Sequence, residues 1–435
     1  MSLVELAKTR LDDYLARGPA EDRNFRERAW QEFMRRGLPT RKTETWKYSN
    51  LSLIEKSPWE SADVKSDSAL PAELLSEISA LNEKWSGKFD VIVLVNGELR
   101  RDLSVAHFDK FQITIGPAKL QIGSQPGSDL IFEDGFLGLS AAVSRSGLSI
   151  DVPEGVDVAR PLLVIRAHVG DRGWASVFNR VRLGRGACLR LAEVHMGPRE
   201  NEYLRTEITS VAQEADSVFD WIRVQNDGLK AAHISDVQAH LGEGARLNFT
   251  QLHVGAQWAR SSLRSDLHGV RGEAHIHGLS FGRLQQHLDQ RIQVVHRAPQ
   301  STSSQLFKSV LKDRARGVLN GRIHIFPDAQ KVLSSQLNHN LLLSPGAEAD
   351  TKPELEIYAD DVKANHGATV GRLDEEKLFY LRSRGIRMHE AQQMLAQAFV
   401  MDVLMKVRSP QLEELANDRV RRWLPEFLAE MEKEL

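Results

Sequence analysis

The chain has 435 residues, and at about 150 residues per domain this length suggests two or three domains. Its 57 basic and 59 acidic residues leave a net charge of −2, which argues against binding to nucleic acid through bulk positive charge. Its single cysteine, Cys188, excludes an internal disulfide and a metal site built from several of its own thiolates. Since neither a signal peptide nor a membrane-spanning apolar run is found, we expect a cytoplasmic protein without membrane contacts.

Residues 1–146 are predicted to mix helices and strands. Leucines recur at helical spacing over residues 3–15, and a second helix is expected over residues 22–36. A further helix is expected over residues 71–85, with its proline in the first turn. The apolar run at 91–95, followed by an Asn-Gly pair, predicts a strand that ends in a tight turn.

Residues 147–366 are predicted to form an all-β domain. Short apolar or β-branched runs alternate here with Gly, Pro, Asp and Asn, and no long helical stripe interrupts them. Clear examples of such runs lie at residues 148–152, 162–165, 181–183 and 323–326.

A glycine turn that leads into a strand repeats weakly through this region. It is clearest around Gly186 and Gly244, and looser copies surround Gly272 and Gly346. The intervals between these glycines are 58, 28 and 74 residues, of which the first two fit one unit near 28. Stacked units of this kind favour a β-helix, while a β-sandwich with recurring turns stays open.

Residues 367–435 are predicted to be helical. Asp374 is expected to cap a helix that carries two glutamates in its first turn and ends near Arg384, before Gly385. A helical stripe follows over residues 394–404. Ser409-Pro410 begins a last helix, which we expect to kink or break at Pro425.

Histidines are the first candidates for chemistry, because ten of the fifteen lie between His233 and His339. His275 and His277 share one face of a predicted strand and form a possible two-point metal site. No third ligand stands at a confirming interval, so solvated or hydrogen-bonded histidines are the favoured interpretation.

Cys188 lies on the same predicted strand face as Arg190, whose guanidinium would lower the pKa of the thiol. A packed, inert cysteine is nevertheless the favoured interpretation. A basic run is suited to a phosphate or an acidic partner, but a solvated face is the favoured interpretation. The run comprises Lys308, Lys312, Arg314, Arg316 and Arg322. No phosphate-binding loop of the Gly-x-x-x-x-Gly-Lys-Ser/Thr type occurs.

The most unusual stretch runs from residue 338 to residue 386. In it, His366 follows a strand-like segment and precedes glycines typical of a turn. This stretch closely resembles the SufB/SufD family of iron–sulfur cluster assembly proteins, on the SufD-like side. The matching segments are residues 342–353, 356–363, 366–371 and 378–386, with 314–321 and 327–331 upstream and Thr43–Tyr48 near the N-terminus.

The resemblance implies a mainly β fold, in which a right-handed parallel β-helix (147–366) lies between an N-terminal α/β region (1–146) and a C-terminal α-helical region (367–435). It also implies a non-catalytic scaffold subunit rather than an enzyme. Such chains pair with a SufB-like subunit, and a SufC-like ATPase docks on the C-terminal helices, here about 374–435.

The resemblance also implies one site residue, His366. It matches the family's histidine at the SufB–SufD interface, a ligand of the nascent Fe–S cluster that is shared with the partner. Some relatives carry a cysteine two residues earlier, where this chain has Ala364. The family is linked to reduced flavin as well, for which no residue here is assigned, and we expect no tightly bound cofactor on the isolated chain.

Two other functions stay open. One is a stand-alone metal-binding homodimer, because an edge that pairs with a related subunit can also pair with its own copy. The other is a β-helix enzyme acting on polysaccharide, with Glu354 and Glu356 on one strand face. A cytoplasmic chain without nucleic-acid or membrane partners fits the scaffold better than the polysaccharide enzyme.

Overall fold

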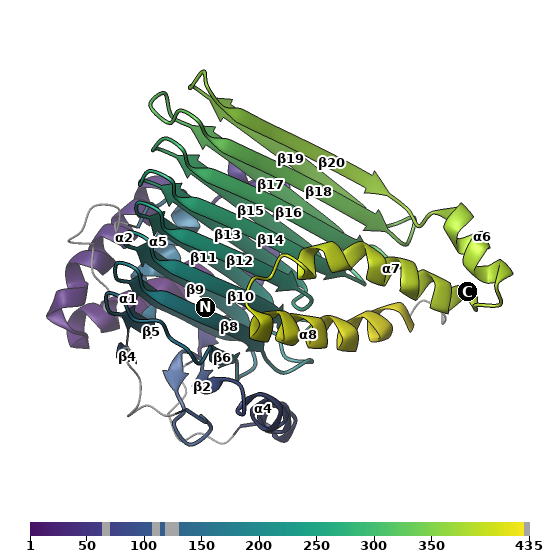
Figure 1. Cartoon of the computed structure of the whole chain (residues 1–435). Helices are drawn as coiled ribbons and strands as arrows, with labels where there is room; N and C mark the ends of the chain where they lie inside the picture. Colours follow the sequence, from purple (N-terminus) through teal and green to yellow (C-terminus); the bar gives the residue numbers. More distant parts are fainter. Residues whose placement is uncertain (63–69, 107–113, 118–129, 430–435) are drawn as a thin grey trace.

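The computed structural model describes residues 1–62, 70–106, 114–117 and 130–429. Its centre is a parallel β-helix, a flattened solenoid built from two ten-stranded sheets that face each other (Figure 1). The predicted architecture, a β-helix between an N-terminal α/β region and C-terminal helices, is confirmed.

The strands alternate between the two sheets along the chain, so each turn of the solenoid adds one strand to each sheet. Sheet A holds β4 (Thr114–Pro117), β5 (Arg145–Val152), β7 (Gly173–Leu183), β9 (Leu204–Gln213), β11 (Ala232–Leu241), β13 (Trp258–Leu267), β15 (His287–His296), β17 (Arg316–Ile325) and β19 (Glu348–Ile357), with β1 (Glu60–Ser61) paired to β7. Sheet B holds β3 (Glu98–Leu99), β2 (Asp90–Val95), β6 (Leu162–Ala167), β8 (Cys188–Met196), β10 (Val218–Asn226), β12 (Arg246–His253), β14 (Glu273–Gly282), β16 (Thr302–Leu311), β18 (Leu333–Leu342) and β20 (Lys363–Gly371).

One left-handed backbone position recurs two residues before the sheet B strands of the solenoid. Its φ angle ranges from 58° to 63°, a region that glycine enters without strain. The position is occupied in turn by Gly186, Asp216, Gly244, Arg271, Gln300 and Lys331. Gly346 instead precedes β19, at the opposite edge of the solenoid. The 74-residue interval that did not fit the repeat is therefore two turns and a half.

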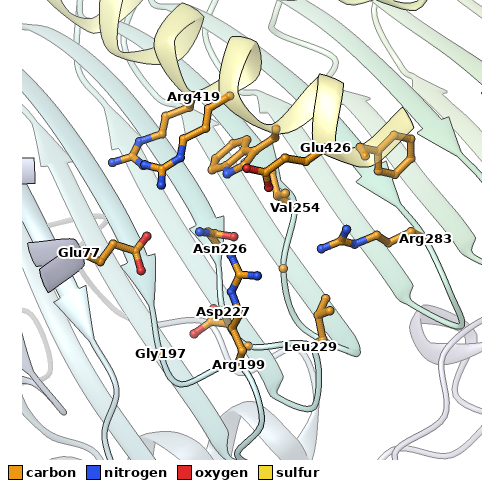
Figure 2. A pocket seen from close by; sticks show the side chains of 15 residues that line it. Glu77, Gly197, Arg199, Asn226, Asp227, Leu229, Val254, Arg283, Arg419 and Glu426 are labelled. Carbon is orange, nitrogen blue, oxygen red and sulfur yellow. The ribbon is translucent and has the colours of Figure 1, made fainter. Parts of the chain in front are cut away.

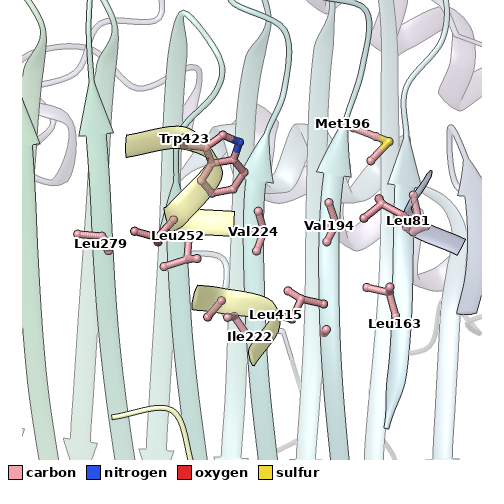
Figure 3. Close-up of a cluster of buried hydrophobic side chains, with 14 of the residues drawn as sticks. Leu81, Leu163, Val194, Met196, Ile222, Val224, Leu252, Leu279, Leu415 and Trp423 are labelled. Carbon is pink, nitrogen blue, oxygen red and sulfur yellow. The ribbon is translucent and has the colours of Figure 1, made fainter. Parts of the chain in front are cut away.

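Helices cover the outer faces of both sheets. On sheet A lie α1 (Leu3–Arg17), α2 (Arg23–Arg36), α3 (Ser52–Lys56) and α5 (Gly135–Ala142), with the short helices η1 (Ala20–Asp22) and η2 (Glu44–Trp46). On sheet B lie α4 (Ala72–Trp85), α7 (Met388–Leu404) and α8 (Pro410–Ala429). In Figure 3, Leu415 and Trp423 of α8 lie over apolar side chains of sheet B such as Val224. The predicted helices and the strand after α4 are thus present, with Pro71 just before α4 rather than inside it.

The C-terminal helices confirm one expectation and correct another. Asp374 accepts hydrogen bonds from the backbone of Glu376 and Lys377 at the start of α6 (Glu375–Ser383), and Gly385 follows that helix with a φ of 85°. Of the kink or break expected at Pro425, the break is wrong, because α8 continues to Ala429. The ring of Phe427 packs against Phe281, with centroids 5.6 Å apart, and this packing outweighs the backbone hydrogen bond that proline cannot donate.

Two further observations concern membrane-spanning helices and the domain boundaries. Among the described helices, none has both the length and the apolar character needed to cross a membrane. The domain boundaries after residues 146 and 366 stay predictions; β2 joins sheet B beside β6, and β20 spans the second boundary.

Candidate functional site at the open end of the solenoid

The solenoid ends in one open rung, formed by β19 and β20. These strands are the last of sheet A and sheet B, and within the described part of the chain neither has a strand on its outer edge (Figure 1). Every second residue of β19 and of β20 therefore presents its backbone groups to an edge without a partner strand. A free strand edge is a template for pairing with another chain. We call this pair of strands the terminal rung.

His366 lies inside β20, not in the loop that its glycine neighbours suggested. Gly367 and Gly371 are extended here rather than left-handed, and an added Cβ at Gly367 would lie 3.2 Å from Leu337 of β18. The glycine thus accommodates a close side chain instead of making a turn. The His366 side chain is exposed, and no hydrogen bond or ion pair reaches it from the residues that the structure describes.

A row of buried amides leads through the solenoid interior to His366. The parallel register pairs Gln305 with Gln336, and Gln336 with His366. Both glutamines are 2% exposed, and each has at least one amide atom without a hydrogen-bond partner. Gly321 makes room for the second, because an added Cβ would lie 1.5 Å from the Gln336 amide nitrogen. The interior is therefore polar where it opens at the terminal rung.

Ala364 precedes His366 on the same inward side of β20, since side chains alternate along a strand. It is half-buried against an apolar cluster that includes Ile323 and Val332. Because an alanine has no ligand atom, the imidazole of His366 is the donor that this pair of positions offers to a metal or cluster.

Cys188 is remote from this end. It begins β8, and six strand spacings of sheet B separate β8 from β20, which is roughly 30 Å at about 4.8 Å per strand. Burial raises the pKa of the Cys188 thiol to about 11 and outweighs the opposite effect of Arg190. At neutral pH the thiol is protonated and weakly nucleophilic, so the inert interpretation is supported.

The histidine pair at 275 and 277 does share the outward face of β14, as predicted. The imidazole of His275 contacts the Ser304 hydroxyl at 2.7 Å and the Glu273 carboxylate at 3.0 Å. Burial lowers the pKa of His277 to about 3. Neither belongs to a group of three or more ligands in the described residues, in keeping with hydrogen-bonded strand histidines.

Most of the basic run is occupied by ion pairs within the chain. Lys308 contacts Asp402 at 2.6 Å, and Arg316 contacts Asp350 at 2.6 Å. Arg322 pairs with Glu356. Glu354 pairs with Lys352 in turn. The two glutamates proposed as a catalytic pair are thus both engaged by cations, and neither the basic run nor the carboxylates form a free site.

Sequence reasoning missed a buried ionisable cluster inside the solenoid. The imidazole of His195 contacts Glu207 at 2.8 Å, and that of His233 contacts Asp227 at 2.7 Å. Burial lowers the pKa of His195 to about 4. The one available signal was that His195 and His253 occupy equivalent inward positions of sheet B, two turns apart. A second group of possible metal ligands consists of His240, Asp266 and His268, of which Asp266 is buried and His268 is exposed.

A second exposed surface lies on α6, which projects beyond the solenoid (Figure 1). This helix has no buried residue, and its Phe379 and Tyr380 are 76% and 57% exposed. Two large exposed aromatic side chains at consecutive positions of one helix mark a surface for a protein partner.

Comparison with known proteins points to a single family. A family model for the SufBD core domain of the SUF system of FeS cluster assembly matches residues 170–399. The chain is 30% identical over 400 residues to the iron–sulfur cluster assembly protein SufD of Escherichia coli, covering 91% of each chain. It is 24% identical over 387 residues to a SufBD family protein of Synechocystis, covering 85% of this chain and 84% of that one.

The chain is also 23% identical over 450 residues to the chloroplast protein ABCI7 of Arabidopsis thaliana, covering 96% of this chain and 90% of that protein. The family model covers the β-helix from before β7 into α7 and includes the terminal rung. On this evidence, the chain belongs to the SufB/SufD family and has a role in iron–sulfur cluster assembly in the SUF system.

Proposed function

We propose that this chain is a non-catalytic scaffold subunit of a SUF complex, in which its terminal rung pairs with a SufB-like subunit. The observation that carries this proposal is the position of His366. It lies exposed on a strand with a free edge, at the end of a buried polar row. A partner strand laid along β20 would bring its own side chains beside this imidazole.

The cluster is cargo that the two subunits share, with His366 as the contribution of this chain. Iron–sulfur clusters are held mainly by thiolates, and the one cysteine of this chain is roughly 30 Å from His366. The thiolates must therefore come from the partner. A neutral imidazole binds iron and leaves when it is protonated, which suits a nascent cluster that has to be passed on.

ATP hydrolysis belongs in this proposal to a separate SufC-like subunit. The sequence has no phosphate-binding loop of the usual type. The exposed Phe379 and Tyr380 of α6 offer that subunit an apolar docking surface in the predicted C-terminal region. Reduced flavin stays a prediction for the complete complex, without an assigned residue. The cytoplasm stays the proposed compartment, because one cysteine in 435 residues fits reducing conditions.

The free edges also support self-association, so we propose a homodimer when the chain is alone. The same strand can pair with a second copy related by a two-fold axis. The polysaccharide enzyme has no such support, because Glu354 and Glu356 are both engaged in ion pairs.

Affinity capture of the tagged full-length chain from its native host tests this proposal. We expect a SufB-like chain and a SufC-like ATPase in stable proportion, identified by mass spectrometry. The scaffold role would be contradicted if the tagged chain were recovered only with copies of itself, under conditions in which the amount of tagged chain does not limit capture.

A further inference from the structure

A polar pocket lies far from the terminal rung, between α8 and the turns that lead from sheet B to sheet A. Its volume is about 820 Å³ when the space open to solvent is included. The turns after β8, β10 and β12 form one wall, and α8 forms the other. Four arginines line it: Arg199, Arg283, Arg419 and Arg422. Figure 2 shows Arg199, Arg283 and Arg419 directed into this space from the turns and from the helix.

Arg419 is the unusual member of this set. Its residue is 2% exposed, yet its Nε and one terminal nitrogen, Nη2, have no hydrogen-bond partner among the described residues. No described carboxylate lies within ion-pair distance of it, although Glu77 and Asp418 act on it electrostatically from further away. A buried cation without a partner is strongly destabilising. A folded protein that keeps one calls for a ligand that completes it.

Among the residues that the structure describes, the carboxylates of the pocket do not fill that role. Asp227 is held by the imidazole of His233 at 2.7 Å and by the Tyr203 hydroxyl at 3.0 Å. Glu77 and Glu426 line the pocket without a hydrogen bond to Arg419. Arg419 thus lines a solvent-open pocket in which no described carboxylate is hydrogen-bonded to it.

The chemistry of the lining selects the kind of anion. Guanidinium groups bind phosphate through paired hydrogen bonds in a fixed planar geometry. Beside the arginines, Trp423, Phe427 and Val254 add an apolar wall, which suits the organic part of a phosphate ester. We propose that this pocket binds a phosphate group, either as inorganic phosphate or as a small phosphate monoester, with Arg419 as the buried ligand.

This inference does not depend on the proposed function, because the pocket lies on the first half of the solenoid and shares no residue with the terminal rung. It assigns a small-molecule site to the junction between the solenoid and its C-terminal helix. Binding there would tie α8 to the turns through one shared ligand.

Isothermal titration calorimetry on the full-length chain tests the site, with inorganic phosphate and adenosine monophosphate as probes and sodium chloride holding the ionic strength constant. We expect both probes to bind. Equal affinities would assign the site to phosphate alone, and tighter binding of the nucleotide would assign it to a monoester. The absence of binding by both probes would overturn the proposal.

Variants then locate the binding. Arg419→Gln should weaken phosphate binding by about tenfold or more, since a charged hydrogen-bonding group is lost. Arg421→Gln is the matched control, because Arg421 is exposed on the same helix and lines a different cavity. Unchanged binding in Arg419→Gln would overturn the assignment.

A second variant keeps the test decisive if Arg419→Gln does not fold. Arg199 has a side chain that is 73% exposed, so Arg199→Gln leaves the packing of the chain intact. We expect weaker phosphate binding in this variant as well, with an unchanged unfolding temperature in the absence of phosphate. Wild-type affinity in Arg199→Gln, together with a non-folding Arg419 variant, would also count against the site.

Discussion

His366 is paired in parallel register with Gln336, so an exposed histidine continues a row of amides that is buried within the solenoid. The terminal rung therefore combines a free strand edge with an exposed imidazole. The edge strand supplies backbone groups for pairing, and the imidazole stands where a partner strand would run.

A proline at the free edge of β20 should block subunit pairing without disturbing the solenoid. The backbone N–H of Lys363 donates to Val332, which lies on the side of β18. Because these directions alternate along a strand, the N–H of Ala368 points to the free edge. Ala368→Pro therefore removes an edge donor and keeps the bonds to β18.

Light scattering after size-exclusion chromatography checks this prediction. We expect Ala368→Pro to be monomeric and to lose capture of the SufB-like chain, whereas the control Ala368→Val, which keeps its N–H, behaves as wild type. Normal pairing in the proline variant would place the interface elsewhere.

The apolar surface of α6 should carry the ATPase contact. Replacing Phe379 and Tyr380 with serine removes two exposed aromatic side chains and should weaken capture of the SufC-like subunit by about tenfold or more. Deleting residues 389–435 is a poorer test, because it also uncovers Leu279 and Phe281 of sheet B.

The matched control for α6 is Met34→Ser, which removes an apolar side chain that is 65% exposed on α2. Quantitative pull-down with the purified SufC-like ATPase subunit compares how much of it the double serine variant of α6 and the Met34→Ser control each capture. Equal capture by both would show that α6 is not the docking surface.

Cys188 should be slow to alkylate in the folded chain. Its pKa of about 11, against an ordinary value of 9.0, leaves about a hundredfold less thiolate at pH 8. The expected result is an alkylation rate about a hundredfold below that of the urea-unfolded chain. Mass spectrometry reads the rate directly, since the chain has one cysteine. Comparable rates in the two states would refute the inert assignment.

Stability should fall in mild acid because buried histidines resist protonation. Burial lowers the pKa of His296 from 6.5 to about 4, and its two ring nitrogens contact Ser301 and Ser303. Between these two pH values the unfolded chain binds more protons than the folded chain. The free energy of unfolding therefore decreases as the pH falls from 6.5 towards 4, and this contribution is complete above pH 6.5.

The pH dependence of one residue can be isolated by substitution. His296→Gln should reduce the loss of unfolding free energy between pH 8 and pH 5 by about 2 kcal/mol. Urea unfolding at both pH values measures this difference and cancels any uniform change in stability. The exposed His366→Asn serves as the comparison. An unchanged difference in His296→Gln would show that His296 does not titrate in this way.

The fold class could be predicted from the sequence, but the regular repeat of the solenoid was visible only in part. The left-handed position before each sheet B strand holds glycine at 186 and 244, but Arg271, Gln300 and Lys331 further on. Non-glycine residues adopt positive φ here because the surrounding structure holds them there, so the glycines alone reveal only part of the repeat. The same holds at Pro425, where packing of the final helix outweighs the local tendency of proline to end a helix.

The candidate site was predictable only in part. His366 was identified through a resemblance to the family, while its local glycines suggested a loop that does not exist. The His195–Glu207 contact and the unpartnered Arg419 depend on segments that meet only in the folded solenoid. No local pattern marks such contacts, because His195 and Glu207 lie 12 positions apart on facing sheets and inward-facing residues of successive turns are separated by almost 30 positions.

The most direct test of the account is cluster assembly in a reconstituted complex of this chain with its SufB-like and SufC-like partners. We expect His366→Ala to fold and to enter the complex normally but to assemble far less cluster, measured by visible absorbance and iron and sulfide content. His339→Ala, on the outward face of neighbouring β18, should assemble cluster as wild type does. A normal cluster yield with His366→Ala would contradict the central claim that this histidine belongs to the assembly site.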